Sequence, residues 1–243
     1  MGEARKEILE KIADEIEFEK SIITDFGTIE SLKTVPVVKK IAQNLGERVL
    51  KETQGGQVIP LEDAIKVLKL CENPTILPCL CRQMAGEEKY CCLNFGLIPE
   101  LYKKANPDEY MEEVSLTTAE RLLRDWDKEG LYHVILWGRV PYVTCICNCT
   151  ASYCVAYKGR YESGLQHALI KGEYVVRVNQ EKCRGCKTCL TRCQFGAVSF
   201  NVDHGKAFVD IRKCTGCGLC MSGCSNNAIQ IIERQLTPAK AFW

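Results

Sequence analysis

The chain has 243 residues and a formal net charge of +1, and its 46% apolar and 26% charged residues are typical of a folded globular protein. No apolar run approaches the roughly 20 residues needed to cross a bilayer, and the first 20 residues are charged throughout. We therefore expect neither membrane insertion nor a secretory signal. An odd number of cysteines, 17, excludes complete disulfide pairing within the chain. These features predict a reducing, cytoplasmic location, where thiols are first interpreted as metal ligands or redox groups.

The first part of the chain, residues 1–170, is predicted to form a mainly helical, cysteine-rich domain. Apolar residues recur at helical spacing over residues 3–24. Pro36 is well placed to begin a second helix, and residues 61–73 have the pattern of a third. This part is called the N-terminal half below.

A further helix and a strand are predicted near the end of this half. Thr117 and Glu120 have the spacing of a capping box, in which each side chain binds a free backbone N–H of the first helical turn. The helix that they introduce should end at Gly130, because glycine readily adopts the left-handed conformation that ends helices. Residues 131–137, LYHVILW, then have the composition of a strand.

Two stretches of the N-terminal half, residues 79–92 and 145–154, together contain eight cysteines. In an extended chain, residues two apart point to the same side with their Cα atoms about 6.6 Å apart. That distance is close to the upper limit of disulfide geometry, about 6.8 Å, so a C-x-C pair makes a poor disulfide. Such a pair can instead present two thiolates to a metal centre. The pairs are Cys79 with Cys81 and Cys147 with Cys149, and Cys91 or Cys92 can add another thiolate.

The last part of the chain contains the spacing C-x2-C-x2-C-x3-C twice, at residues 183–193 and 214–224. Three closely spaced thiolates can wrap one corner of an iron–sulfur cubane, whereas the fourth lies too far along the chain and reaches the other cluster. The first ligand set is therefore predicted to be Cys183, Cys186, Cys189 and Cys224. The second ligand set is predicted to be Cys214, Cys217, Cys220 and Cys193.

The segments around these motifs alternate between apolar and polar residues, which predicts strands at 173–178 and 228–233 and a hairpin that turns at His204-Gly205. This part resembles the bacterial two-cluster [4Fe-4S] ferredoxin domain. The resemblance implies a small α+β domain over residues 171–234 with two [4Fe-4S] clusters, followed by a tail at 235–243. Gln194 and Ser225 stand where that family usually has proline. Zinc bound by the eight thiolates is the alternative.

The N-terminal half resembles an uncharacterised cysteine-rich extension of ferredoxin-like proteins from anaerobes. The similarity rests on the segments PLEDAIKVL, PCLCR, CLNFG, EGLYHV and CICNC. It favours as ligands Cys79, Cys81, Cys92, Cys147 and Cys149, and it leaves as weaker candidates Cys91, Cys145 and Cys154. We expect an additional iron–sulfur centre here, with a zinc site or unmetallated thiols as the alternatives. The chain as a whole is then an α+β protein of two domains.

Charge divides unevenly between the two parts. Residues 1–170 carry 21 basic and 26 acidic side chains, whereas residues 171–243, the C-terminal half, carry 11 and 5. An acidic N-terminal half is unsuited to nucleic acid, whose binding is dominated by phosphate contacts. The basic C-terminal half can offset the negative charge of the clusters or dock to an acidic partner.

The sequence therefore predicts an electron-transfer protein, or a subunit of a multi-subunit oxidoreductase, that relays single electrons between redox proteins. A metalloenzyme that reduces a small molecule at the N-terminal centre, supplied with electrons by the ferredoxin part, is the second hypothesis. A redox-sensing regulator is the third. No catalytic residue is identified, because the sequence has no P-loop, no dinucleotide-binding fingerprint in a strand–turn–helix setting and no serine-elbow motif.

Overall fold

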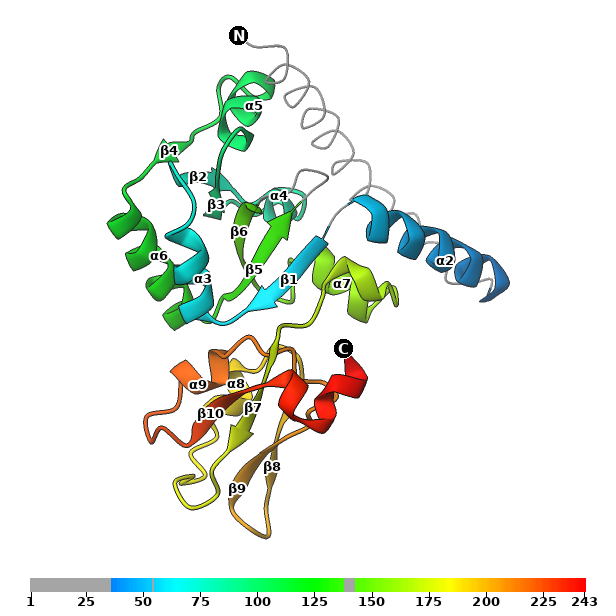
Figure 1. Ribbon diagram of the computed structural model, residues 1–243, viewed down its shortest axis with the longest axis vertical. Helices are drawn as coiled ribbons and strands as arrows, with labels where there is room; N and C mark the ends of the chain where they lie inside the picture. The colour runs from blue at the N-terminus through cyan, green and yellow to red at the C-terminus, as the bar shows by residue number, and fades with distance from the viewer. Residues whose placement is uncertain (1–35, 54, 138–142) are drawn as a thin grey trace.

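The computed structural model describes residues 36–53, 55–137 and 143–243, so the helix predicted at residues 3–24 lies outside the described residues. It is a mixed α/β structure whose sheets are all antiparallel. The N-terminal half surrounds a six-stranded sheet, and the C-terminal half lies at one end of it (Figure 1). Among the described helices, none combines the length and the apolar character needed to cross a membrane.

The six-stranded sheet has the order β1-β5-β6-β3-β2-β4. Strands β5 and β6 lie inside the sheet; β5 is rich in β-branched and aromatic residues, which suit a buried pleated surface, whereas three of the seven residues of β6 are cysteines. Ile146 of β6 pairs with Leu93 on one side and with Ile135 on the other, and its side chain is fully buried. The strands are β1 Gly55–Ile59, β2 Thr75–Pro78, β3 Tyr90–Asn94, β4 Glu112–Glu113, β5 Tyr132–Trp137 and β6 Val143–Cys149.

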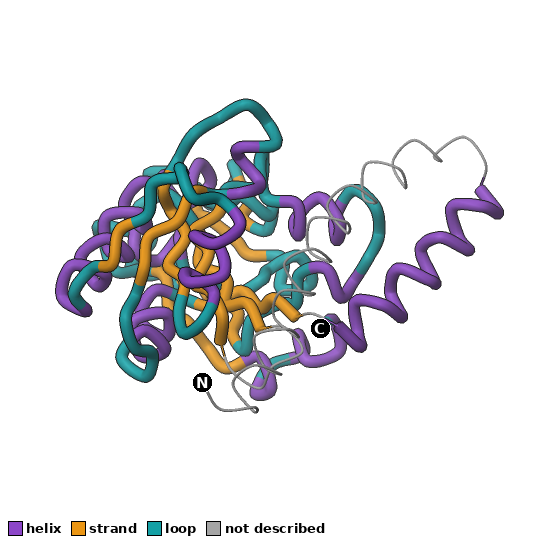
Figure 2. Tube along the Cα trace, turned by 90° about the horizontal axis from the view of Figure 1, so that it is seen from above, coloured by secondary structure: helices purple, strands orange, loops and turns teal. Residues whose placement is uncertain are grey.

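Helices pack around this sheet. Helix α3 packs on α6, and both helices contact β5. Leu68 of α3 and Leu123 of α6 are fully buried. Helix α2 extends away from the strands (Figure 2). The helices are α2 Pro36–Thr53, α3 Leu61–Leu68, α4 Leu80–Gln83, α5 Ile98–Ala105, α6 Leu116–Glu129, α7 Val155–Tyr161 and the 3-10 turn η2 Gln166–Ala168.

The prediction of a mainly helical N-terminal domain is not confirmed, because a sheet forms the centre of its described part. The strand predicted at 131–137 is present as β5, but four of the other five strands have no more than five residues each. Strands that short carry too few alternations to be separated from loops by sequence pattern. Their stability comes instead from pairing with β5 and β6.

The boundaries of α6 are partly as predicted. The helix is capped two residues before the expected Thr117, because the Ser115 hydroxyl accepts a hydrogen bond from the Thr118 backbone N–H at 3.1 Å. Glu120 pairs with Arg124, one turn along the helix. At the other end Gly130 has a φ of 95°, so the predicted glycine cap is confirmed.

The C-terminal half has the strands and the hairpin that the sequence predicts. Strand β7 Tyr174–Val178 pairs with β10 Ile229–Glu233, and β8 Val198–Asn201 pairs with β9 Lys206–Val209. A short helix carries the third cysteine of each motif, Cys189 in α8 Thr188–Arg192 and Cys220 in α9 Leu219–Ser222. The two halves of the cysteine pattern thus take equivalent local conformations.

The C-terminal tail folds back onto this half. It forms the 3-10 turns η3 Arg234–Leu236 and η4 Pro238–Phe242. The buried Lys171 amine donates to the Phe242 carbonyl at 2.7 Å, and the Arg234 guanidinium lies 5.8 Å from the Trp243 ring centre. The tail therefore packs against the domain that precedes it.

Gln194 joins the two halves. Its side-chain oxygen accepts a hydrogen bond from the Ala151 backbone N–H at 2.6 Å, and its amide nitrogen donates to the Gly130 carbonyl. A proline at this position, usual in the resembled family, has no side-chain group that can make either bond. The departure from the family pattern therefore has a structural role in this chain.

We expect Gln194→Ala to destabilise the full-length protein by about 1–3 kcal/mol, because it leaves two partly buried backbone groups without partners. The exposed Gln230 on β10 provides the control, and its replacement by alanine should cost less than about 0.5 kcal/mol. Anaerobic urea unfolding measures both. Equal midpoints for the two variants would contradict the proposed role of Gln194 at this interface.

Candidate metal centres

The first ligand set surrounds one small cavity. The loop that carries it is tightly folded: Gly185 and Lys187 both have positive φ, at 69° and 67°. A Cβ on Gly185 would lie 2.3 Å from the Gly205 carbonyl oxygen, so only glycine fits against the hairpin turn. The cavity is lined by all four cysteines of the set, Cys183, Cys186, Cys189 and Cys224, and every other lining residue also belongs to the C-terminal half.

The second ligand set is deeper in the protein. Cys214, Cys217 and Cys220 are buried and Cys193 is half-buried, whereas Cys186 of the first set is exposed. Burial raises the pKa of the Cys217 thiol to about 12, and the neighbouring Cys214 and Cys193 add to this rise. Burial likewise raises the pKa of Cys220, again beside those cysteines.

The fourth cysteine of each motif lies with the other loop. Cys224, from the second motif, lines the cavity of the first set. Cys193, from the first motif, acts on the pKa of Cys214, Cys217 and Cys220. The fourth cysteines are therefore exchanged between the loops, as the spacing predicts.

An unpartnered polar atom next to the second set fits an iron–sulfur cluster. Arg234 Nη1 is buried and has no hydrogen-bond partner within the described part of the chain, and the Thr215 hydroxyl lies beside Cys217. Arg234 is fully buried and donates to the carbonyl of Cys214 at 3.0 Å. Buried donors of this kind need acceptors. The bridging sulfides of a cluster are acceptors, and the cluster's negative charge would offset that of the guanidinium.

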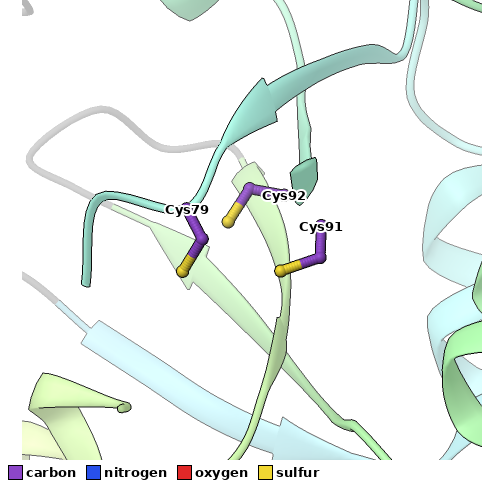
Figure 3. Close-up of side chains that lie close together, drawn as sticks. All are labelled: Cys79, Cys91 and Cys92. Carbon is purple, nitrogen blue, oxygen red and sulfur yellow. The ribbon is translucent and has the colours of Figure 1, made fainter. Parts of the chain in front are cut away.

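The eight cysteines of residues 79–154 form a second thiol-rich region, the N-terminal thiol group. Two triads have all their sulfur atoms within 4.8 Å of one another, and Cys92 belongs to both. The triads are Cys79, Cys91 and Cys92, and Cys92, Cys145 and Cys147. Figure 3 shows the first triad, in which three side chains from two segments point toward a common space.

A β-bulge explains how two consecutive cysteines contribute to one triad. In the pairing of β2 with β3, Leu77 is opposite Cys92 and Pro78 is opposite Tyr90, so Cys91 is the extra residue. Adjacent residues of a regular strand point to opposite faces, but a bulge disrupts that alternation. Cys92 is also directly opposite Cys147 of β6, which brings the second triad together across the sheet.

The remaining three cysteines continue the group. Cys81 lies beside Cys79, and Cys149 lies beside both Cys147 and Cys154, since each pair interacts through its thiols. The expected extended geometry holds for Cys147 and Cys149 on β6. It does not hold for the other pair, because Cys79 precedes helix α4 and Cys81 lies within it.

All eight candidate ligands of this half are therefore neighbours. Cys91 and Cys145, the weaker candidates by sequence, each belong to a tight triad. Cys81, Cys149 and Cys154 lie around these triads. Cys71 belongs to neither triad and is half-buried against the apolar core.

The close approach of the thiols favours thiolates at some positions. Hydrogen bonds from Cys81, Cys91 and Cys92 hold the pKa of Cys79 well below its usual range. A bond to Cys79 in turn raises the pKa of Cys91 to about 12, against the opposing charge of Arg82. Thiolates are the form that binds metal, so the group is prepared for a cation.

Three residues that the sequence analysis did not assign to a site support this group. Asn148 lies between two ligand candidates and donates to the Cys91 carbonyl at 2.7 Å. Its oxygen contacts Nδ1 of His133 at 2.7 Å, and His133 is fully buried, as expected for a core residue. Asp127 lies 3.8 Å from the other ring nitrogen. The only sequence signal was an asparagine, which is uncommon in strands, within a C-x-C-x-C run.

Arg82 closes one side of the group. It is buried, it donates to the Thr150 hydroxyl at 3.1 Å, and its guanidinium lies 4.5 Å from the ring centre of Tyr153. It therefore ties the segment after β2 to the segment after β6. A cation near thiolates also offsets their charge.

Comparison with known proteins supports this geometry in the C-terminal half. Residues 175–225 match the family model described as the 4Fe-4S dicluster domain, and this span contains all eight cysteines of the two ligand sets. The comparison with curated proteins found no match. The C-terminal part of the chain therefore contains a ferredoxin-type 4Fe-4S domain, built to bind at least one iron–sulfur cluster.

Proposed function

We propose that the chain is an electron-transfer protein or subunit that relays single electrons between redox proteins through two [4Fe-4S] clusters. The observation that carries the proposal is the exchange of the fourth cysteines, with Cys224 beside the first loop and Cys193 beside the second. One cluster would be held by the first ligand set and the other by the second. Each such cluster accepts or releases one electron when bound.

We further propose an additional iron–sulfur centre in the N-terminal thiol group. A zinc ion needs four ligands, whereas eight cysteines are neighbours here. The buried Tyr132 hydroxyl lies beside Cys154, with Cys149 also near, so this part of the group is enclosed as well.

Burial favours a carrier over the alternative of a metalloenzyme. Six of the eight thiols in the N-terminal group belong to buried residues, and the other two are half-buried. A catalytic metal keeps one position open to substrate. Thiols enclosed to this extent leave little access for a substrate but do not impede electron transfer. The redox partners are proposed to be proteins, because the basic C-terminal half offers a charged surface on which a protein can dock.

Replacing both Cys147 and Cys149 with serine should remove the iron in excess of about eight atoms per chain and leave the ferredoxin-type signals intact. The reason is that both cysteines belong to the N-terminal thiol group, whereas the two proposed ferredoxin-type ligand sets use other cysteines. Anaerobic iron and sulfide analysis together with EPR measures this. Cys71→Ser is the control and should keep all the iron. Wild-type protein with eight irons and one zinc, or with eight irons and no other metal, would contradict the third centre.

Cyanide should leave the EPR spectrum of the reduced wild-type protein unchanged, because a carrier has coordinatively saturated centres. The spectrum is recorded with and without an excess of the anion. A shift confined to the signal that Cys147→Ser/Cys149→Ser abolishes would show an open iron site and favour the metalloenzyme.

A further inference from the structure

The second ligand set and the N-terminal thiol group share one apolar core. Cys217 of the second set packs in the same buried cluster as Cys149 and Cys154, together with Tyr132 and Phe195. Tyr132 is fully buried, and its ring centre lies 5.0 Å from that of Phe195. Its hydroxyl lies beside Cys154, and the charges of Cys149 and Cys217 also act on it. Tyr132 therefore lies between thiols of the two halves.

Other contacts hold the N-terminal half over this loop. The residue before Cys193 is Arg192, which donates to the Asp127 carbonyl at 2.6 Å and to the Lys128 carbonyl at 3.0 Å. A Cβ on Gly218 would lie 3.3 Å from Pro60 at the end of β1. These contacts flank the second ligand set on both sides and fix its distance from the N-terminal thiol group.

The first ligand set has a different environment. All residues that line its cavity belong to the C-terminal half, and Cys186 is exposed. Lys182, Arg184 and Lys187 surround this loop and are also exposed. A cationic surface around an accessible cluster ligand suits a redox partner with an acidic surface.

We propose that electrons enter or leave the protein at the first ligand set and reach the N-terminal centre only through the second. The proposal rests on the proposed function, because it needs the third centre. The internal step is the loss of one electron by the cluster on the second set and its gain by the N-terminal centre. No bond forms or breaks in this step, and no proton is transferred. Tunnelling slows steeply with distance, so the shared core around Tyr132 provides the short route between the halves.

The test uses full-length, anaerobically loaded protein mixed with a reduced acidic [2Fe-2S] ferredoxin, with each centre followed by freeze-quench EPR. The donor is a protein, so it cannot approach buried thiols. In the wild type, the N-terminal signal should appear after the signals of the two ferredoxin-type clusters. In Cys217→Ser, the first cluster should still be reduced, while reduction of the N-terminal centre should slow by tenfold or more.

Tyr132→Leu keeps every proposed ligand and tests the contact itself. Reduction of the N-terminal centre should slow at least tenfold, with reduction of the first cluster unchanged. Tyr161→Leu is the matched control, because its ring also packs on Phe195, at 5.9 Å, but belongs to a partly exposed residue. Wild-type rates at the N-terminal centre in both Cys217→Ser and Tyr132→Leu would overturn the proposal. The iron count of the wild type, taken beforehand, reports separately on the proposed third centre.

Charge reversal tests the entry point. Lys182→Glu should slow the reduction of all three centres by the acidic ferredoxin by the same factor, since all electrons pass the first ligand set. Reduction by dithionite, a small anion that does not dock on this surface, should slow much less. Slowing confined to one ferredoxin-type cluster, with the N-terminal centre reduced normally, would contradict a single entry point.

Discussion

Thiols packed against one another inside the protein are the constraint on which the rest of the structure depends. Within the N-terminal group, sulfur atoms approach within 4.8 Å in two triads that share Cys92. Thiolates this close repel one another in a buried site unless a cation neutralises them. Metal binding removes that cost and also ties distant segments together, so the free energy of binding becomes free energy of folding. The same argument applies to the two ligand sets of the C-terminal half.

The two halves meet beside buried thiols of both. Cys217 and Cys154 lie in one apolar core, and Gln194 adds hydrogen bonds to Gly130 and Ala151. An electron carrier needs short, fixed distances between its centres, and rigid packing supplies them. The exposed loop around Cys186 stays outside this interface and belongs wholly to the C-terminal half. The first ligand set is therefore accessible from outside the protein, whereas the second ligand set and the N-terminal thiol group are enclosed.

How much the sequence predicts depends on how local the information is. The two ligand sets follow from spacings of two and three residues, and the strands that flank them are confirmed. The sheet of the N-terminal half was missed because its short strands are stabilised by pairing with distant residues. The bulge that adds Cys91 to a triad, and the reach of Gln194 across the interface, depend on tertiary contacts and left no pattern in the sequence.

Anomalous X-ray scattering from an anaerobically grown crystal, collected on both sides of the iron and zinc absorption edges, tests the central claim most directly. The account predicts iron at three places: within each of the two ferredoxin-type ligand sets and within the N-terminal thiol group around Cys92. It also predicts no signal specific to zinc. Zinc at Cys92, or iron confined to the C-terminal half, would contradict it.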